Sequence, residues 1–318
     1  MTLYTQPHLA SSLIMARPTD FGFNEQTTDN EFQNKPDQIN SEDTRKKANI
    51  EFDKMAELLT KHKVEVLILE KAPTEQLLPD AIFPNNWFST RADGTIFIYP
   101  MKAANRQAEV QIEGLKQILA KANYSVNSVV DLRNNFENHG VLEGTGSLIF
   151  HHPSASLFAA YSERCTKDAL QSFSRKYHYQ LFDFFSSSEN AVPVYHTNVV
   201  MSCGESFAVI AKSCMKNDNH TKTVLHKLEE QMEDVIYISE HQMATRFCGN
   251  ILQIKNADGQ NCIVMSRSAH DGFESQQLQI LKKHGELIVC DIPTIEYVGG
   301  GSARCMIAEN FIPKSSAI

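Results

Sequence analysis

Short apolar runs alternate along the whole chain with longer amphipathic stretches. The runs have the length and the β-branched and aromatic content of strands. We therefore predict strands at "LIMARP", "VEVLILE", "TIFIYP", "GSLIF", "SLFAAY", "VPVYHTNVVM", "SFAVIA", "DVIYIS", "ILQIK", "CIVMS" and "ELIVCDI". Apolar residues at helical spacing predict helices over residues 41–62, 105–122, 162–176, 221–232 and 272–284. Ser41 with Asp43 and Thr44 is typical of a helix start, and so is Ser162 with Glu163.

Strands interleaved with helices in this way indicate an α/β fold. No Pro/Ser-rich linker and no block of charge divides the chain, so we expect one domain over residues 1–318. The polar, turn-rich segment 22–43 interrupts the pattern. It predicts a loop, which is either a mobile loop over a site or a plain surface loop.

The composition favours a small-molecule partner. The 318 residues are 42% hydrophobic, which suffices for a buried core, and they carry a formal net charge of -8. That charge argues against a broad basic face for nucleic acid or acidic lipid. No apolar run of about 18 residues predicts a membrane span. The polar start "MTLYTQPHLASS" lacks the layout of a secretory signal, so we expect a cytoplasmic protein.

Seven cysteines without a CxxC pair fit neither a disulfide framework nor a zinc site. Cys203, Cys262 and Cys290 lie in apolar runs, where a cysteine is typically a small core residue. His151, His152 and the loop histidines show no metal-ligand spacing. We therefore expect no metal site.

Two segments in the first half of the chain carry residues suited to chemistry. "PDAIFPNNW" (79–87) brings together an acid, two asparagines and the only tryptophan. Neighbouring asparagines usually mark a turn, but the apolar "WFST" that follows also fits a strand end at a pocket. "LEGTGSL" (142–148) sets Glu143 against two glycines. It has no lysine and no helix start, so it is not a phosphate loop, and an exposed acid on a glycine bulge is the plain alternative.

Two further segments lie in the second half. "PVYHTNVVM" (193–201) puts His196 and Asn198 on one face of a predicted strand. A hydrogen-bonded core histidine and a functional pair both fit that pattern. "VGGGSARCMIAE" (298–309) places three glycines and Arg304 before Cys305. Such a backbone suits a thiol presented to a ligand, and it equally suits a tight turn or a phosphate-binding loop.

Cys305, His196 and Glu143 are the residue types of nucleophilic catalysis. A cysteine attacks as the thiolate and needs a cationic neighbour such as a protonated histidine or an arginine. An acid can hold that histidine in its charged form. Residue type and spacing alone leave this triad as one alternative among several.

The same segments, together with "SERC" (162–165), resemble the signature segments of the guanidino-modifying enzyme superfamily in order and spacing. This superfamily includes arginine deiminases, dimethylarginine dimethylaminohydrolases and amidinotransferases. The match runs from "ARP" at 16–18 to Cys305. The resemblance implies the pentein fold, a five-bladed α/β propeller with pseudo-fivefold symmetry, whereas the periodicity of the chain indicates only α/β.

The resemblance implies roles for the matching residues. Cys305 resembles the nucleophile, His196 the general acid/base, and Glu143 the acid that engages the substrate head and the histidine. Asp80 matches an acid that lines the pocket. The arginines expected to hold a substrate carboxylate by paired hydrogen bonds are Arg164 and, as a weaker match, Arg106.

Arg304 resembles the arginine beside the nucleophile in arginine deiminases, where it would lower the thiol pKa or touch the substrate carboxylate. Two positions depart from the family pattern. Arginine-specific members have a carboxylate at the position of Asn86, and arginine deiminases have another at that of Asn198. A guanidinium gains roughly 4 kcal/mol from a carboxylate at 4 Å and an effective dielectric near 20. An amide, in contrast, can donate a hydrogen bond to the oxygen of a neutral ureido group.

These asparagines resemble the citrulline ureidase branch, also described as citrulline utilisation hydrolase. That branch implies hydrolysis of citrulline to ornithine, carbon dioxide and ammonia through an S-carbamoyl enzyme, without a metal or an organic cofactor. Three alternatives stay open: an arginine deiminase or dimethylarginine dimethylaminohydrolase, an amidinotransferase, and a non-catalytic ribosome-binding pentein. The last kind lacks the Cys/His/Glu set.

The expected partner is a small ureido or guanidino amino acid, with no nucleic acid and no membrane. The oligomeric state is open, with a homodimer as one alternative. Cys165 stands where many relatives have threonine. It is either a neutral replacement or a second thiol near the pocket.

Overall fold

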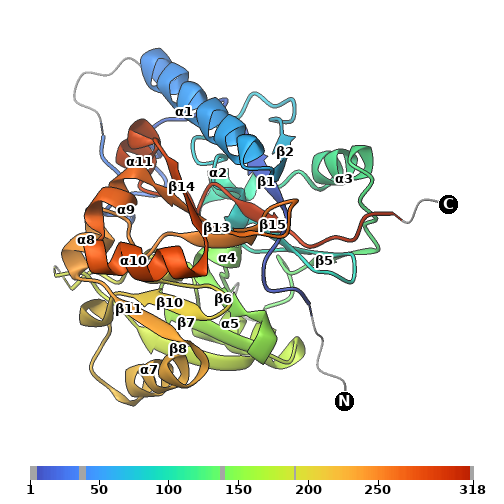
Figure 1. Ribbon diagram of the computed structural model, residues 1–318. Helices are drawn as coiled ribbons and strands as arrows, with labels where there is room; N and C mark the ends of the chain where they lie inside the picture. The colour runs from blue at the N-terminus through green and yellow to red at the C-terminus, as the bar shows by residue number, and fades with distance from the viewer. Residues whose placement is uncertain (1–5, 36–40, 137–139, 190, 316–318) are drawn as a thin grey trace.

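The computed structural model describes residues 6–35, 41–136, 140–189 and 191–315. Within these ranges the strands form five three-stranded sheets that follow one plan (Figure 1). In each sheet the middle strand pairs antiparallel with one neighbour and parallel with the other. The two parallel strands are joined by a crossover that carries helices, because parallel strands cannot be joined by a tight turn.

The sheets are β15-β1-β2, β3-β4-β5, β6-β7-β8, β9-β10-β11 and β12-β13-β14. Their strands are β1 (Ser12–Ala16), β2 (Glu65–Leu69), β3 (Phe88–Thr90), β4 (Thr95–Ile98), β5 (Ser128–Asp131), β6 (Ile149–His151), β7 (Ser156–Tyr161), β8 (Gln180–Phe185), β9 (Met201–Cys203), β10 (Phe207–Ile210), β11 (Asp234–Tyr237), β12 (Leu252–Lys255), β13 (Asn261–Ser266), β14 (Glu286–Cys290) and β15 (Ala308–Asn310). The helices are α1 (Ser41–Lys61), α2 (Ala104–Gln107), α3 (Ile112–Lys121), α4 (Gly144–Ser147), α5 (Lys167–Lys176), α6 (Thr197–Val200), α7 (Asn219–Gln231), α8 (Glu240–Ala244), α9 (Arg267–Gly272), α10 (Ser275–His284) and α11 (Pro293–Gly299).

The first sheet joins the two ends of the described chain. β15 runs antiparallel to β1, with Ser12 opposite Asn310, and the two strands lie side by side in Figure 1. β15 thus occupies the place that β3, β6, β9 and β12 occupy in the other sheets. The turn before β15, which carries Cys305, is therefore equivalent to the turns before those strands.

Most predicted elements are confirmed. The helices expected over 41–62, 221–232 and 272–284 are α1, α7 and α10, and the stretch 105–122 contains two helices, α2 and α3. The helix expected over 162–176 was placed too early, since α5 begins at Lys167. Ser162 and Cys165 exchange main-chain hydrogen bonds in a tight turn, which keeps the preceding residues out of the helix.

The strand predicted over "VPVYHTNVVM" is wrong for most of its length. His196 precedes the short helix α6, and only Met201 belongs to a strand, β9. The Thr197 hydroxyl donates to the Ser147 carbonyl at 2.7 Å and accepts from the Ala160 amide at 2.8 Å. Residues around Thr197 are therefore bonded to β7 and α4 of the preceding sheet unit instead of forming a strand.

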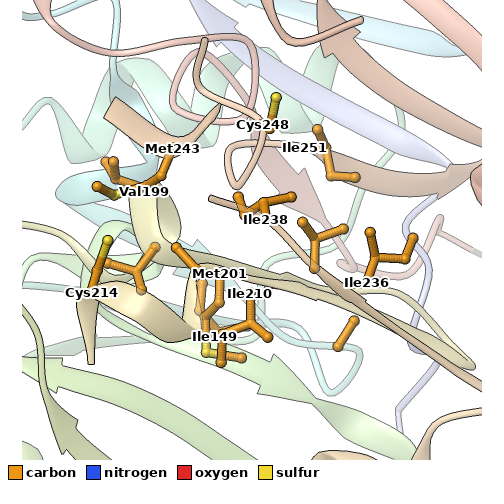
Figure 2. Close-up of a cluster of buried hydrophobic side chains, with 14 of the residues drawn as sticks. Ile149, Val199, Met201, Ile210, Cys214, Ile236, Ile238, Met243, Cys248 and Ile251 are labelled. Atoms are coloured by element: carbon orange, nitrogen blue, oxygen red, sulfur yellow. The ribbon is translucent and has the colours of Figure 1, made fainter. Parts of the chain in front are cut away.

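The core consists of apolar residues packed between the sheets and their helices. β1 is buried along its whole length, as expected for a strand covered on both faces. Figure 2 shows part of the cluster around the fourth sheet, whose members include Val199, Met201, Ile210, Ile236 and Met243. Cys262 and Cys290 are buried core residues as predicted, whereas Cys203 is half-buried. Among the helices within the described ranges, none combines the length and apolar character needed to cross a membrane.

Ile210→Ala is expected to lower the free energy of unfolding by about 2–5 kcal/mol, because it removes buried methyl groups and leaves a cavity. Ile210 is 0% exposed, and its matched control is Ile50→Ala on α1, where Ile50 is 54% exposed. The control should change stability by less than about 0.5–1 kcal/mol. Urea denaturation followed by circular dichroism measures both variants. Equal midpoints would contradict the assignment of Ile210 to the core.

Candidate active site

The site forms where the chain enters the antiparallel strand of each sheet. Each of these entries is a short turn, and each turn contributes at least one polar or nucleophilic side chain to a common centre. The contributing residues are Asn86 before β3, Glu143 before β6, His196 before β9, Asn250 before β12 and Cys305 before β15. The turns lie against one another, with α4 in contact with both the Pro84–Asn86 turn and α6.

These turns border a small hollow. The predicted site residues that line it are Cys305, His196, Asp80, Asn86, Arg106 and Arg164. Glu143 and Asn198 lie directly behind this lining, bonded to His196 and to Cys305 respectively. Of the predicted set, only Arg304 is directed elsewhere. The structure thus brings together residues that are up to about 225 positions apart in the sequence (80 and 305).

Glu143 and His196 form a buried pair. Glu143 Oε2 lies 2.7 Å from His196 Nε2, and both residues are 3% exposed or less. Burial alone would raise the pKa of Glu143, but the Arg164 charge and the His196 hydrogen bond lower it to about 2. The alternative of an exposed acid on a glycine bulge is therefore wrong.

Burial dominates at the histidine. It lowers the pKa of His196 to about 4 although the Glu143 hydrogen bond raises it, so the imidazole is neutral near pH 7. The expectation that an acid holds this histidine in its charged form is not met in the unliganded site. A carboxylate only accepts hydrogen bonds, so the neutral ring carries its hydrogen on Nε2 and leaves Nδ1 as a proton acceptor.

The Cys305 thiol is surrounded by amides. Asn250 Nδ2 lies 3.2 Å and Asn198 Nδ2 3.5 Å from Cys305 Sγ. Burial raises the pKa of the Cys305 thiol, against smaller lowering effects of the Ser302 main chain, Asn250 and Arg304. Cys305 is thus a neutral thiol that faces Nδ2 of Asn250 and the amide group of Asn198, whose Oδ1 lies 3.7 Å from the sulfur.

Arg106 and Asn86 are linked at the wall of the hollow. Arg106 Nη1 donates to Asn86 Oδ1 at 2.6 Å, and its other donors bind Glu109 and the main-chain carbonyls of Asp80 and Phe83. The guanidinium is 2% exposed. It serves as a buried anchor of Asn86, and its expected role as a ligand of a substrate carboxylate stays a prediction.

The amide of Asn86 has one defined orientation. A guanidinium only donates, so the atom facing Arg106 must be the oxygen, and Nδ2 points the other way. Nδ2 is buried and has no hydrogen-bond partner within the described chain. It lies beside Gly146, where an added Cβ would come within 2.3 Å of Nδ2 and 3.0 Å of the His196 ring. Gly146 is therefore required for Asn86 and His196 to approach each other.

Arg164 connects the site to the segment that covers it. It forms a two-point contact with Asp29, through Nη2–Oδ1 at 2.9 Å and Nε–Oδ2 at 3.3 Å. Its Nη1 lies 3.7 Å from Glu143 Oε2, and its guanidinium lies over the Tyr195 ring at 4.7 Å. Arg164 is thus the principal positive charge acting on Glu143.

Residues 24–33, the cap segment, lie over the hollow. Asp80 accepts hydrogen bonds from Asn24 at 2.7 Å, Thr27 at 3.2 Å and Gln33 at 3.4 Å. Asn30 lines the hollow and donates to the Gly299 and Gly300 carbonyls. Of the two alternatives for residues 22–43, a loop over a site describes this part, whereas residues 36–40 lie outside the described ranges.

The glycine run before Cys305 lets the cap segment lie close to the main chain at the hollow. Gly300 has a φ of +62°, and a Cβ there would lie 2.7 Å from Asn30 Nδ2 and from the Gln33 amide. The Gly300 carbonyl also accepts from the Tyr195 hydroxyl at 2.6 Å. The run is therefore a helix end that lets the cap segment come close, not a phosphate-binding loop.

Arg304 does not line the hollow. Its guanidinium donates to the Ile307 carbonyl at 2.9 Å and to Glu309 at 3.0 Å. Of the two roles expected for Arg304, lowering the thiol pKa fits this position and contact with a substrate carboxylate does not. Cys165 is buried in the core away from the hollow, and burial raises its pKa to about 12. Of the two alternatives for Cys165, a neutral replacement of threonine fits this position better than a second thiol near the pocket.

Sequence reasoning missed Asn250, Asp29 and the cap contacts of Asn24, Thr27 and Asn30. Asn250 sits in "FCGNIL", a glycine–asparagine turn before an apolar run, like "FPNNWF" and "ARCMIA" at the other entries. Comparing these entries would have found it. Among the described residues no group of three or more His, Cys, Asp or Glu is arranged to hold a metal ion.

Comparisons with known proteins find a matching family and structures of similar fold. The model of the eukaryotic N,N dimethylarginine dimethylhydrolase family matches residues 17–312. A search of curated protein sequences finds no match. The arginine dihydrolase ArgZ of the cyanobacterial ornithine–ammonia cycle superposes with a TM-score of 0.71 at 14% identity, over 96% of this chain and 41% of that one.

Two further structures are of similar length to this chain. The N-terminal domain of ArgZ, in a mutant bound to substrate, gives a TM-score of 0.69 at 15% identity over 94% of this chain and 97% of the domain. A dimethylarginine dimethylaminohydrolase (DDAH) mutant from Pseudomonas aeruginosa, complexed with citrulline, gives a TM-score of 0.64 at 13% identity. The superposition covers 95% of this chain and 100% of that one. This chain thus spans about 41% of full-length ArgZ and nearly all of its N-terminal domain.

The structural likeness establishes the fold, and the family model establishes membership. The five small α/β sheets are those of the pentein fold, as the sequence resemblance implied. The matched family is named for the hydrolysis of N,N-dimethylarginine, which is a guanidino amino acid. We conclude that this chain belongs to the N,N-dimethylarginine dimethylhydrolase family of the pentein superfamily.

Proposed function

We propose that this chain hydrolyses the ureido group of citrulline, giving ornithine, carbon dioxide and ammonia. The observation that carries the proposal is the unpartnered Nδ2 of Asn86 at the hollow beside His196. A buried donor without an acceptor costs free energy, on the order of 1–3 kcal/mol, unless a ligand satisfies it. The oxygen of a ureido group is such an acceptor, whereas a guanidinium has none to offer.

Asn198 supports the same choice of substrate. Its Nδ2 lies 3.5 Å from Cys305 Sγ, close to where a reacting carbon would meet the thiol. An aspartate here would leave a carboxylate without a cationic substrate to pair with, at the cost of desolvating it. At position 86, where Arg106 would remain a counter-charge, an aspartate would instead replace the Nδ2 donor by an acceptor. Amides at both positions suit a neutral head group and can donate to the oxyanion of the tetrahedral intermediate.

The first chemical step follows from the protonation states. His196 is neutral and accepts the Cys305 proton at Nδ1, while Glu143 stabilises the imidazolium that forms. The thiolate attacks the ureido carbon, and His196 gives the proton to the departing δ-amine. Ornithine leaves, and a carbamoyl group remains on the sulfur.

The second step reverses the direction of proton flow. His196, neutral again, accepts a proton from water as that water attacks the S-carbamoyl carbon. The thiolate leaves and recovers the proton from His196. The released carbamate decomposes to carbon dioxide and ammonia. Asp80 accepts N–H groups of the substrate, and Arg164 is better placed than the saturated Arg106 to hold its carboxylate.

A guanidino substrate is the second candidate, and Asp80 is the observation that favours it. Asp80 lines the hollow, and the hydrogen bonds that its carboxylate receives come from uncharged side chains, Asn24, Thr27 and Gln33. A carboxylate in this position suits a cationic head. The matched family is named for dimethylarginine, and the superposed ArgZ is an arginine dihydrolase.

Purified protein should release ornithine and ammonia from citrulline, but neither product from arginine or dimethylarginine supplied in parallel. Cys305→Ala should lower the rate by about 10³-fold or more, because it removes the nucleophile. Cys165→Ala is the matched control and should keep the wild-type rate. Amino-acid analysis and an ammonia assay measure the products. Formation of citrulline from arginine would instead establish the guanidino candidate.

Asn86→Asp with Asn198→Asp should lower kcat for citrulline by about 10²-fold, the loss typical of a removed oxyanion donor. The double variant adds two negative charges, so Asn217→Asp with Asn219→Asp, at exposed positions, is the matched control. Circular dichroism checks that both variants fold. Undiminished turnover of citrulline in the first variant would refute the roles given to the two amides.

Iodoacetamide should modify Cys305 of the unliganded protein at a rate that still rises about tenfold per pH unit between pH 7 and 9, because burial raises the thiol pKa. Peptide mapping by mass spectrometry follows each cysteine separately. Cys165 should stay unmodified, since burial raises its pKa to about 12 and it lies outside the hollow. A plateau below pH 8 would mean that Cys305 rests as a thiolate.

A further inference from the structure

Arg164 meets a carboxylate of the protein itself at the edge of the hollow. Asp29 approaches its guanidinium at two points, Nη2–Oδ1 at 2.9 Å and Nε–Oδ2 at 3.3 Å. This is the paired geometry with which an arginine recognises any carboxylate. The Arg164 side chain is 4% exposed and Asp29 is 28% exposed, so the acid is the accessible partner.

The two arginines of the hollow differ in how replaceable their partners are. Arg106 is bonded to Glu109, which is 1% exposed and lies on the same short segment of chain, and to main-chain carbonyls. Arg164 is bonded to an acid on the cap segment, which has no helix or strand among residues 24–33. Only the Arg164 pair can exchange its carboxylate without dismantling the buried core.

Lys102 offers Asp29 a second position. Its Nζ lies 3.2 Å from Asp29 Oδ2 and also contacts Glu163, and the Lys102 side chain is 37% exposed. If Asp29 leaves Arg164, it keeps Lys102 as a counter-charge. The incoming carboxylate then supplies the charge that Arg164 loses, so neither ion is left unpaired.

The cap segment does not need to open for this exchange. It is also held by Asn24, Thr27 and Gln33 on Asp80, and by Asn30 on the Gly299 and Gly300 carbonyls. These bonds involve neither Asp29 nor Arg164. A small movement of the Asp29 side chain toward Lys102 is enough to free one face of the guanidinium.

We propose that Asp29 is an internal competitor for the substrate carboxylate: it occupies Arg164 in the unliganded protein and yields it to the carboxylate of an amino-acid substrate. This rests on the proposed function only in requiring an amino acid as the substrate. Asp29 therefore sets affinity for carboxylate-bearing ligands. Because its exchange precedes the chemistry, it does not alter the reacting groups.

Asp29→Asn should strengthen citrulline binding, since an amide competes less well than a carboxylate for a guanidinium. We expect a dissociation constant about 3- to 10-fold lower, the factor by which self-occupation reduces the fraction of competent sites. The probe 4-ureidobutylamine, which is citrulline without its carboxylate, should bind with an unchanged constant. It keeps the ureido head and the ammonium group but has nothing to exchange with Asp29.

Calorimetry in a Cys305→Ala background measures both constants without turnover. Glu25→Gln is the matched control, because Glu25 lies on the same segment and pairs with the exposed Lys35. It should leave both constants unchanged. Turnover by the wild-type protein is measured first, with citrulline and with other ureido and guanidino amino acids. If none of them is turned over, the proposed function itself fails.

Two results overturn the competitor role while leaving the proposed function intact. Weaker citrulline binding in Asp29→Asn would mean that Asp29 orients Arg164 for the substrate. Equal strengthening of citrulline and 4-ureidobutylamine would mean that Asp29 acts by closing the cap segment and not by competing for Arg164. Strengthening confined to citrulline supports the proposal.

Discussion

An ionised carboxylate at the centre of the fold, Glu143 with 1% exposure, is the constraint on which the site depends. A buried charge costs several kcal/mol unless partners compensate it. Here the partners come from three different places in the chain: Arg164, the His196 ring and the Lys102 amide at 3.0 Å. The turns that carry these groups cannot shift independently, because any such movement would leave the Glu143 carboxylate exposed or without a partner. The same ionised carboxylate then fixes the hydrogen of His196 on Nε2 and keeps Nδ1 free for proton transfer.

The repeated plan of the sheets explains how so many polar groups reach one point. Each unit enters its antiparallel strand through a turn, and α4 contacts both the Pro84–Asn86 turn and α6. Turns can direct side chains and N–H groups inward, whereas the strands around them must fill their inner faces with apolar residues. Close approach of the turns leaves no space for a Cβ at Gly146, where Asn86 and His196 come together. A glycine at position 146 is therefore required both by the packing of the turns and by the approach of Asn86 to His196.

Local patterns predicted the elements better than the site. The apolar runs located β1, β7 and β13 because each strand is covered on both faces and reads as a continuous apolar stretch. "VPVYHTNVVM" failed because tertiary hydrogen bonds of Thr197 override its strand propensity. His196 and Cys305 were found through residue type and family resemblance, but Asn250 and Asp29 were not. Their contacts span 55 and 135 positions respectively. Asn250 is marked only by the likeness of its turn to the turns at the other strand entries, and no local pattern marks Asp29.

The donors at the sulfur connect substrate choice with activation of the nucleophile. A cationic guanidinium head would itself stabilise a thiolate, so a site built for it needs little help from the protein. A neutral ureido head brings no charge, and burial raises the thiol pKa still further. The protein must then supply the stabilisation through fixed dipoles. Asn250 does so in a single orientation, because its oxygen accepts from the Arg304 amide at 3.1 Å and its nitrogen donates to the Asn198 carbonyl at 2.9 Å. If the substrate is the neutral ureido group that we propose, the amides at Cys305 and the amide at position 86 have one task in common: they stabilise the negative charge that forms beside a head group without charge.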